Sequence, residues 1–153
     1  MPGTQPIVRQ QMLIRVPAKM IYDAFVDPDV TTKFWITHSD GKLEVGTTRK
    51  WEWRQYGAST PITAIELTPQ RILFEWGTAN DQSKVEIELD ERSDGTTLVA
   101  ITNSDFAASS NVVPLALDSM GGFSLVLASA KAWLEHGLDL KLMDDRAPDA
   151  HIR

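Results

Sequence analysis

Aromatic side chains are the residues of this chain whose types and spacing could do chemistry. The sequence holds five tryptophans in 153 residues, and four of them lie in or beside segments whose apolar faces should point inward. Such rings can enclose an apolar ligand, and an indole N–H can orient a polar group on it. Plain core packing stays open as the interpretation of each ring taken singly. For the group we predict a pocket for an apolar small molecule, lined by Trp35, Trp51, Trp53, Phe74, Trp76, Phe123 and Leu127.

Ionisable side chains give weaker indications of catalysis. His38, His136 and His151 have no partner fixed by their spacing, so each is interpreted as a structural or solvent-exposed histidine. Glu52 and Glu75 lie between aromatic residues on predicted strands, and a bulge could turn either carboxylate toward the pocket. Regular alternation instead directs both to solvent. No catalytic residue is therefore assigned.

Composition excludes several other classes of chemistry. The sequence has no cysteine, hence no disulfide and no thiolate site, and it lacks the histidine spacings of zinc enzymes, so neither a metal nor a cofactor is expected. A formal charge of -6 argues against nucleic-acid binding. Residues 1–11 show no signal-peptide pattern, and the apolar runs are shorter than the ~20 residues that span a bilayer. We expect a cytoplasmic protein without membrane insertion.

Hydrophobic periodicity predicts the elements that must position the rings. Residues 7–16 alternate as a strand, a short helix follows over 17–26, and Asp27-Pro28 opens a second one. Residues 41–103 alternate with period two between turn signals, which predicts a strand meander with one apolar and one charged face. Without repeats or linkers, the chain is predicted to be one domain over residues 1–153, with its core at about 7–145 and a tail over 146–153.

A long helix is predicted to cover the apolar face of this sheet. Apolar residues recur at three- and four-residue spacing from Met120 to Leu138, and residues 104–116 before them are predicted to be a partly apolar loop able to gate the pocket. The predicted fold class is α+β, a curved antiparallel sheet of about six to seven strands with two short helices, wrapped on a long C-terminal helix. Because a strongly bent sheet is difficult to fill beneath one straight helix, we expect unfilled space there.

Several short motifs resemble the SRPBCC, or START-like, superfamily, which includes lipid-transfer domains, pollen allergens and polyketide cyclases. They occur at residues 16–18, 23–25, 27–28, 34–35 and 65–76. Residues 95–98 and the pair Gly122-Phe123 are similar to the subgroup related to the C-terminal domain of the heat-shock-protein-90 ATPase activator, although Phe123 departs from that subgroup's usual Gly-Trp pair. The resemblance spans about residues 7–145 and implies the helix-grip fold.

The resemblance leaves three functions open. The first is binding of a lipid or an aromatic, polyketide-like molecule between the sheet and the last helix. The second is a cyclase or dehydratase, which requires an ionisable group facing the pocket. The third is an activator-like domain with a protein partner, which requires an exposed apolar patch outside the pocket. The fold does not choose among them because function depends on the site.

Overall fold

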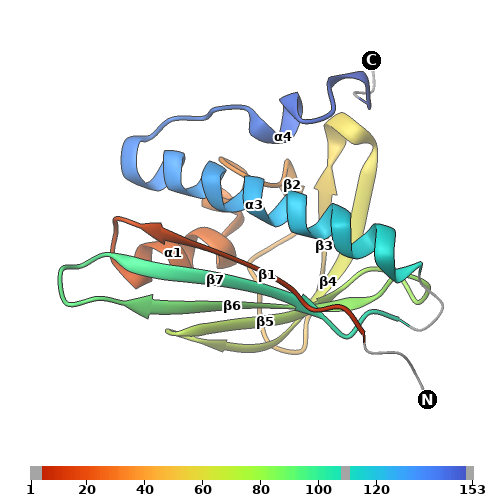
Figure 1. Cartoon of the computed structure of the whole chain (residues 1–153), viewed down its shortest axis with the longest axis horizontal. Helices are drawn as coiled ribbons and strands as arrows, with labels where there is room; N and C mark the ends of the chain where they lie inside the picture. The colour runs from red at the N-terminus through yellow and green to blue at the C-terminus, as the bar shows by residue number, and fades with distance from the viewer. Residues whose placement is uncertain (1–4, 108–110, 151–153) are drawn as a thin grey trace.

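The computed structural model describes residues 5–107 and 111–150, and it confirms the α+β helix-grip class. Seven strands form one curved sheet in the order β1-β7-β6-β5-β4-β3-β2, and every pair of neighbouring strands is antiparallel. The strands are β1 Val8–Ile14, β2 His38–Ser39, β3 Thr48–Trp53, β4 Ala58–Thr68, β5 Arg71–Trp76, β6 Ser83–Glu91 and β7 Thr97–Ser104. The helices are α1 Ala18–Val26, α2 Pro28–Thr31, α3 Val112–His136 and α4 Leu142–Asp145, with short 3-10 turns η1 Arg54–Tyr56 and η2 Pro148–Ala150. Figure 1 shows α3 lying across one side of the sheet.

Alternation along the strands divides the sheet into the two faces that the sequence predicts. On the inner face Ile72, Phe74 and Val85 are completely buried. On the outer face Arg71 of β5 forms ion pairs with Glu66 and Glu86 of the neighbouring strands. Long apolar side chains on one face and paired charges on the other give a sheet that needs cover on one side only.

The two short helices are joined by capping and a buried hydroxyl. The Asp27 side chain accepts a hydrogen bond from the Asp29 amide at 3.0 Å, and Pro28 occupies the first position of α2. Thr31 at the end of α2 is 1% exposed, and its Oγ1 donates to the Ala24 carbonyl at 2.6 Å. This bond fixes α2 against α1 and directs the following residues, Trp35 among them, into the core.

The long helix starts earlier than the sequence predicts. α3 begins at Val112, so part of the predicted 104–116 loop is helical, and residues 108–110 of that loop lie outside the described residues. Pro114 falls within the first turn, where proline is compatible with a helix. The prediction was wrong here because residues 112–116 were assigned to the loop rather than to the start of the helix.

The inner face of α3 forms the cover of the sheet. Phe123, Val126, Leu127 and Ala130 are buried, with spacing of three and four residues. α3 is also long and apolar enough, by length and composition, to cross a membrane, which the sequence analysis did not anticipate. Core helices of globular domains meet the same criterion, and α3 packs its buried face against the sheet.

The chain turns back along α3 after Gly137 (Figure 1). Gly137 has a φ of 64°, and its amide donates to the Trp133 carbonyl at 2.8 Å. The returning segment places α4 beside the β3–β4 hairpin, where Met143 is buried. Arg146, the first residue of the tail in the sequence analysis, directly follows α4.

Candidate functional site

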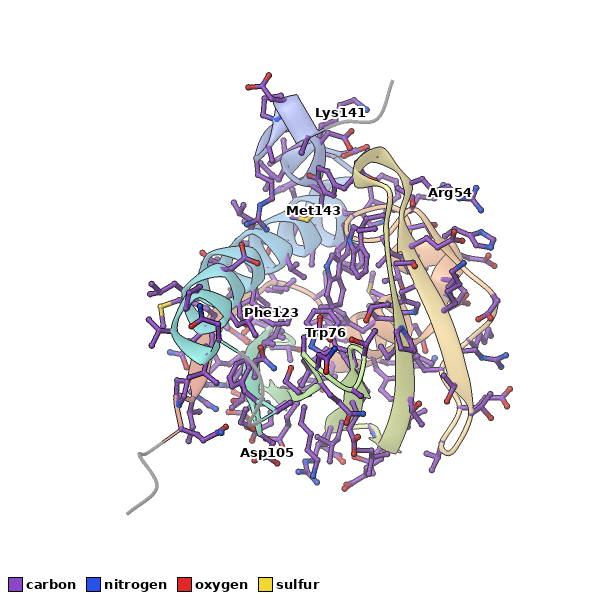
Figure 2. All side chains as sticks on the ribbon, turned by 90° about the vertical axis from the view of Figure 1, so that its right-hand side faces the viewer. Arg54, Trp76, Asp105, Phe123, Lys141 and Met143 are labelled. Carbon is purple, nitrogen blue, oxygen red and sulfur yellow. The ribbon has the colours of Figure 1, made fainter. Side chains whose placement is uncertain are left out.

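A cavity of about 440 Å³ lies between α3, the β3–β4 hairpin and the returning C-terminal segment. Such a volume is in the range of small-molecule sites. Its aromatic wall residues are Trp35, Trp53, Tyr56, Trp76, Phe106 and Phe123; its aliphatic ones are Ala58, Leu115, Val126 and Met143; its polar ones are Ser59, Thr60, Asp81, Ser83, Asn103, Asp118, Ser119 and Arg146. Figure 2 shows Phe123 and Trp76 facing one opening, with Met143 at its upper edge.

Four of the seven predicted pocket residues lie in this wall, namely Trp35, Trp53, Trp76 and Phe123. Trp35 is the centre of the cluster, with ring centroids 6.3 Å from Trp53, 6.0 Å from Trp76 and 6.0 Å from Phe123. Trp76 and Phe123 stack with centroids 5.6 Å apart and planes 28° from parallel. Rings from α3, β5, β3 and the segment after α2 therefore meet around the cavity.

The other three predicted residues lie behind the wall. Trp51 is 2% exposed, Phe74 is completely buried and Leu127 is 1% exposed. Trp51 contacts Trp35 and Phe74, with centroid distances of 5.0 and 5.7 Å. These three side chains form a core layer that supports the wall, and the cavity is bounded by the residues in front of them.

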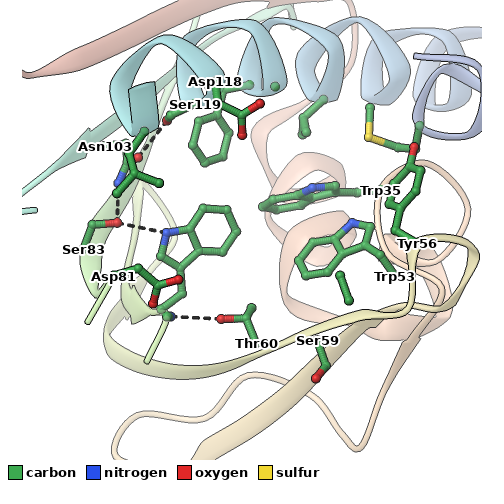
Figure 3. A pocket seen from close by; sticks show the side chains of 18 of the residues that line it. Trp35, Trp53, Tyr56, Ser59, Thr60, Asp81, Ser83, Asn103, Asp118 and Ser119 are labelled. Atoms are coloured by element: carbon green, nitrogen blue, oxygen red, sulfur yellow. Dashed lines mark hydrogen bonds between the residues drawn. The ribbon is translucent and has the colours of Figure 1, made fainter. Parts of the chain in front are cut away.

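A continuous chain of hydrogen bonds crosses one end of the cavity (Figure 3). The Trp76 indole Nε1 donates to Ser83 Oγ at 3.1 Å, and Asn103 Nδ2 donates to the same oxygen at 2.9 Å. Ser119 Oγ of α3 in turn donates to Asn103 Oδ1 at 2.7 Å. Ser83 and Asn103 are 4% and 2% exposed, so the chain ties β5, β6, β7 and α3 together inside the fold.

Charged groups gather at the C-terminal edge of the cavity. Arg146 Nη2 lies 3.5 Å from Asp118 Oδ1 of α3. Burial raises the pKa of the Tyr56 phenol above its ordinary value; the Arg146 guanidinium opposes that rise, and the carboxylates of Asp144 and Asp145 add to it. Tyr56 is therefore held in its protonated form, as a polar but uncharged part of the wall.

The ionisable residues singled out from the sequence lie elsewhere. Glu52 is 3.9 Å from His38 Nε2 and also pairs with Arg54, while Glu75 stands between Thr63 and Lys84 on neighbouring strands. Neither carboxylate is in the cavity wall that the described residues form. The bulge in β4 falls between Ala64 and Glu66, so it turns neither of them inward.

Of the described residues, neither His136 nor any group of possible metal ligands contributes to the cavity. His136 Nε2 lies 3.7 Å from Glu135 Oε1 near the end of α3, and His151 is outside the described residues. Within residues 5–107 and 111–150, no group of three or more His, Cys, Asp and Glu is placed to hold a metal ion.

The sequence analysis did not predict this chain of hydrogen bonds, although the positions of two of its residues on the strands could have indicated it. Ser83 is in phase with buried Val85 and Ile87 on β6, and Asn103 is in phase with buried Ile101 on β7. A polar residue at an inward strand position marks either a satisfied core group or a site. Met143 and Arg146 had no such signal, because their place depends on how the chain returns after Gly137.

Comparison with known proteins gives a family match and several similar folds. A family model described as activator of Hsp90 ATPase homolog 1-like protein matches residues 15–132. No curated protein matches the chain. Protein SSP2350 from Staphylococcus saprophyticus is 28% identical with a TM-score of 0.76, covering 89% of this chain and 96% of that one. DynU16, from the dynemicin biosynthetic locus, is 17% identical with a TM-score of 0.76, covering 87% of this chain and 48% of that one. The Aha1 dimer from Colwellia psychrerythraea is 19% identical with a TM-score of 0.74, covering 86% of this chain and 98% of that one.

Proposed function

The chain belongs to the activator of Hsp90 ATPase homolog 1-like family, and from that premise we propose that it binds an apolar small molecule, a lipid or an aromatic, polyketide-like compound, in the cavity beneath α3. One observation carries the proposal: the cavity of about 440 Å³ is walled by the rings of Trp35, Trp53, Trp76 and Phe123. A ligand there would exchange water for aromatic faces on several sides, which is the main source of affinity in apolar sites.

The wall is also organised before any ligand arrives. The Trp35 ring has five aromatic rings within 6.3 Å of its centroid, and the Trp76 indole is held by its bond to Ser83. A preformed wall reduces the entropy lost on binding, because its side chains are already ordered. An ordered wall of this kind supports a binding site rather than a void left by loose packing.

Native mass spectrometry of the freshly purified protein, followed by titration of tryptophan fluorescence, tests the proposal. The titrated panel contains neutral lipids, fatty acids and fused aromatic ketones. We expect at least one class to bind, and Trp53→Ala to weaken that binding by about tenfold or more, since it removes one wall. Trp133→Ala is the matched control, because Trp133 is partly buried on α3 but is not in the wall. A mass spectrum of the bare chain together with an unchanged fluorescence throughout the panel would reject the proposal.

A second candidate function is an activator-like protein interaction. Val113, Leu117 and Met120 are 63%, 68% and 42% exposed, and their spacing puts them on one outer face of α3. An exposed apolar row of this kind supports contact with a protein partner. The test is the ATPase rate of a purified Hsp90-type chaperone with added wild-type chain or with Leu117→Gln. Stimulation lost in the variant would favour this role, and no stimulation by the wild type would reject it.

A cyclase-like reaction has less support from the wall. Tyr56 is kept protonated, Asp118 is paired with Arg146 at the edge of the cavity, and Asp81 Oδ1 accepts hydrogen bonds from the amide and the hydroxyl of Thr78. A general base needs an ionised group within hydrogen-bond reach of the substrate proton. Binding without chemistry is therefore the function we favour.

A further inference from the structure

The polar chain at the end of the cavity has only one consistent arrangement of its hydrogens. Asn103 Nδ2 lies 2.7 Å from the Lys84 carbonyl oxygen, which can only accept. This contact fixes the amide orientation, since an amide oxygen in that place would face another acceptor. The second Nδ2 hydrogen therefore goes to Ser83 Oγ, and Asn103 Oδ1 accepts from Ser119.

Ser83 is left with a hydrogen to donate. Its Oγ accepts one bond from Asn103 and a second from the Trp76 indole, which is a donor only. Two accepted bonds occupy both lone pairs of the hydroxyl, so its own O–H hydrogen serves neither neighbour. Ser83 is 4% exposed and lies in the cavity wall. A buried hydroxyl donor in this place needs an acceptor, and a ligand in the cavity can supply one.

The charges around the cavity disfavour an anion as that acceptor. Asp81 and Asp118 are in the wall, and Asp144 and Asp145 act on the wall residue Tyr56. Arg146 is the one cation in the wall that the described residues form, and it already pairs with Asp118. A carboxylate or phosphate headgroup would meet an excess of negative charge without a free cationic partner.

We propose that the cavity selects uncharged ligands that carry an accepting oxygen, such as a ring ketone, at the end where Ser83 lies. The proposal rests on the function proposed above and adds the chemical class of the ligand. In the bound complex the apolar body of the ligand lies among the rings of Trp35, Trp53 and Trp76, and its oxygen accepts the Ser83 hydrogen. Fatty acids and other anionic lipids are excluded by charge rather than by size.

Three probes with the same tricyclic skeleton test this selection. Fluorene has no oxygen, fluorenone has a ring carbonyl, and fluorenone-4-carboxylate adds a charged group. Dissociation constants are measured from the indole N–H signals in proton–nitrogen NMR spectra, with the Trp76 signal as the local reporter. Ser83→Ala also removes the acceptor that holds the Trp76 indole, so both neutral probes should lose some affinity. We expect fluorenone to lose about 3- to 10-fold more affinity than fluorene, as loss of one neutral hydrogen bond does. The wild type should bind the carboxylate about tenfold or more weakly than fluorenone.

Ser129→Ala is the matched control, because Ser129 is also a buried serine but donates to the Phe34 carbonyl and is not in the cavity wall. The ratio of fluorenone to fluorene affinity should be unchanged in this variant. A measurement on the wild type alone covers the case in which Ser83→Ala does not fold: the carbonyl stretching frequency of bound fluorenone should fall below its value in hexane.

The outcomes separate this inference from the proposed function. Equal losses for fluorene and fluorenone in Ser83→Ala, an unshifted carbonyl frequency, or equal binding of the carboxylate would overturn the selection for neutral acceptors while leaving a binding cavity. Absence of binding by both neutral probes would instead count against the cavity as a ligand site.

Discussion

The ring of Trp35 meets the ring of Trp51 edge to face, with centroids 5.0 Å apart and planes at 78°. Trp35 lies in the cavity wall, whereas Trp51 lies one layer deeper on β3 and is 2% exposed. The same strand carries Trp53, which is partly buried and reaches the wall. The aromatic cluster thus has a core layer and a wall layer. Substitutions in the two layers should differ in their effect on the free energy of unfolding.

Replacing Trp51 by alanine should lower the free energy of unfolding by about 3–5 kcal/mol, because a buried indole leaves a cavity that its neighbours only partly fill. Trp53→Ala should cost less stability than Trp51→Ala, since its ring is only partly buried. Urea unfolding followed by circular dichroism measures both. A loss for Trp53→Ala as large as that for Trp51→Ala would contradict the assignment of layers.

The sequence could predict which side of a strand faces inward, but it could not predict depth. Trp51 and Trp53 have the same phase on β3, so alternation assigns them the same face. Whether a ring is covered depends on where α3 and the returning segment cross the sheet. That crossing is a property of the tertiary structure, and it explains why the predicted pocket mixed wall residues with core residues.

The alternation of residues along the strands could not predict the polar part of the site or its C-terminal edge. The physical reasons differ between the two. Asn103 was detectable as a polar residue in an inward phase, but its partners come from two other elements, β6 and α3. Met143 and Arg146 are brought to the cavity by a turn at Gly137 and a local backbone at Lys141 with φ of 55°. Local propensity does not determine the direction that the chain takes after such a turn.

Two glycines of the α3 region should respond to alanine with opposite signs. Gly137 has a φ of 64°, and a methyl group added to its Cα would meet no other atom within 4 Å, so Gly137→Ala should cost about 1 kcal/mol from backbone strain alone. Gly121 lies inside α3 with equally open space around it. Gly121→Ala should therefore raise the free energy of unfolding by roughly 0.5–1 kcal/mol. Thermal unfolding of both variants checks the signs; stabilisation by Gly137→Ala would show that the left-handed backbone is not required there.

Glu135 should contribute stability that depends on pH. Its side chain is 8% exposed, and its Oε2 accepts from the Arg15 amide at 2.8 Å and from Lys131 Nζ at 2.5 Å. Burial by itself would raise the pKa of this carboxyl, but Lys131 and the Arg15 amide outweigh burial and hold the pKa below its ordinary value of 4.5. A pKa lowered by folding stabilises the fold above the unfolded value, and this contribution is lost as pH falls through the folded value.

The variant Glu135→Gln should therefore unfold more easily than the wild type at pH 7, by roughly 1.5–3 kcal/mol, which is the size of hydrogen bonds to a charged group. The difference should shrink as the pH is lowered below 4.5. Urea unfolding of both proteins across that pH range measures it. Glu88→Gln is the control, since the exposed pair of Glu88 and Arg9 should contribute little at either end. A difference that stays constant with pH would mean that the charge of Glu135 has no role.

Met143 should hold the returning segment against the cavity. Its side chain is 8% exposed and lies in the wall, while α4 around it is only four residues long. Met143→Ala should therefore release this segment locally while the sheet remains folded, because short peripheral elements open before the core does. Hydrogen exchange at the amides of Asp145 and Arg146, which donate to Lys141 and Leu142, should accelerate about tenfold or more, with the amides of β5 and β6 unchanged. Leu140→Ala serves as the control because Leu140 is 49% exposed in the same segment and should leave the exchange rates unaltered. If β5 and β6 accelerated in step with α4, Met143 would instead be part of the global core, and the returning segment could not open independently of the sheet.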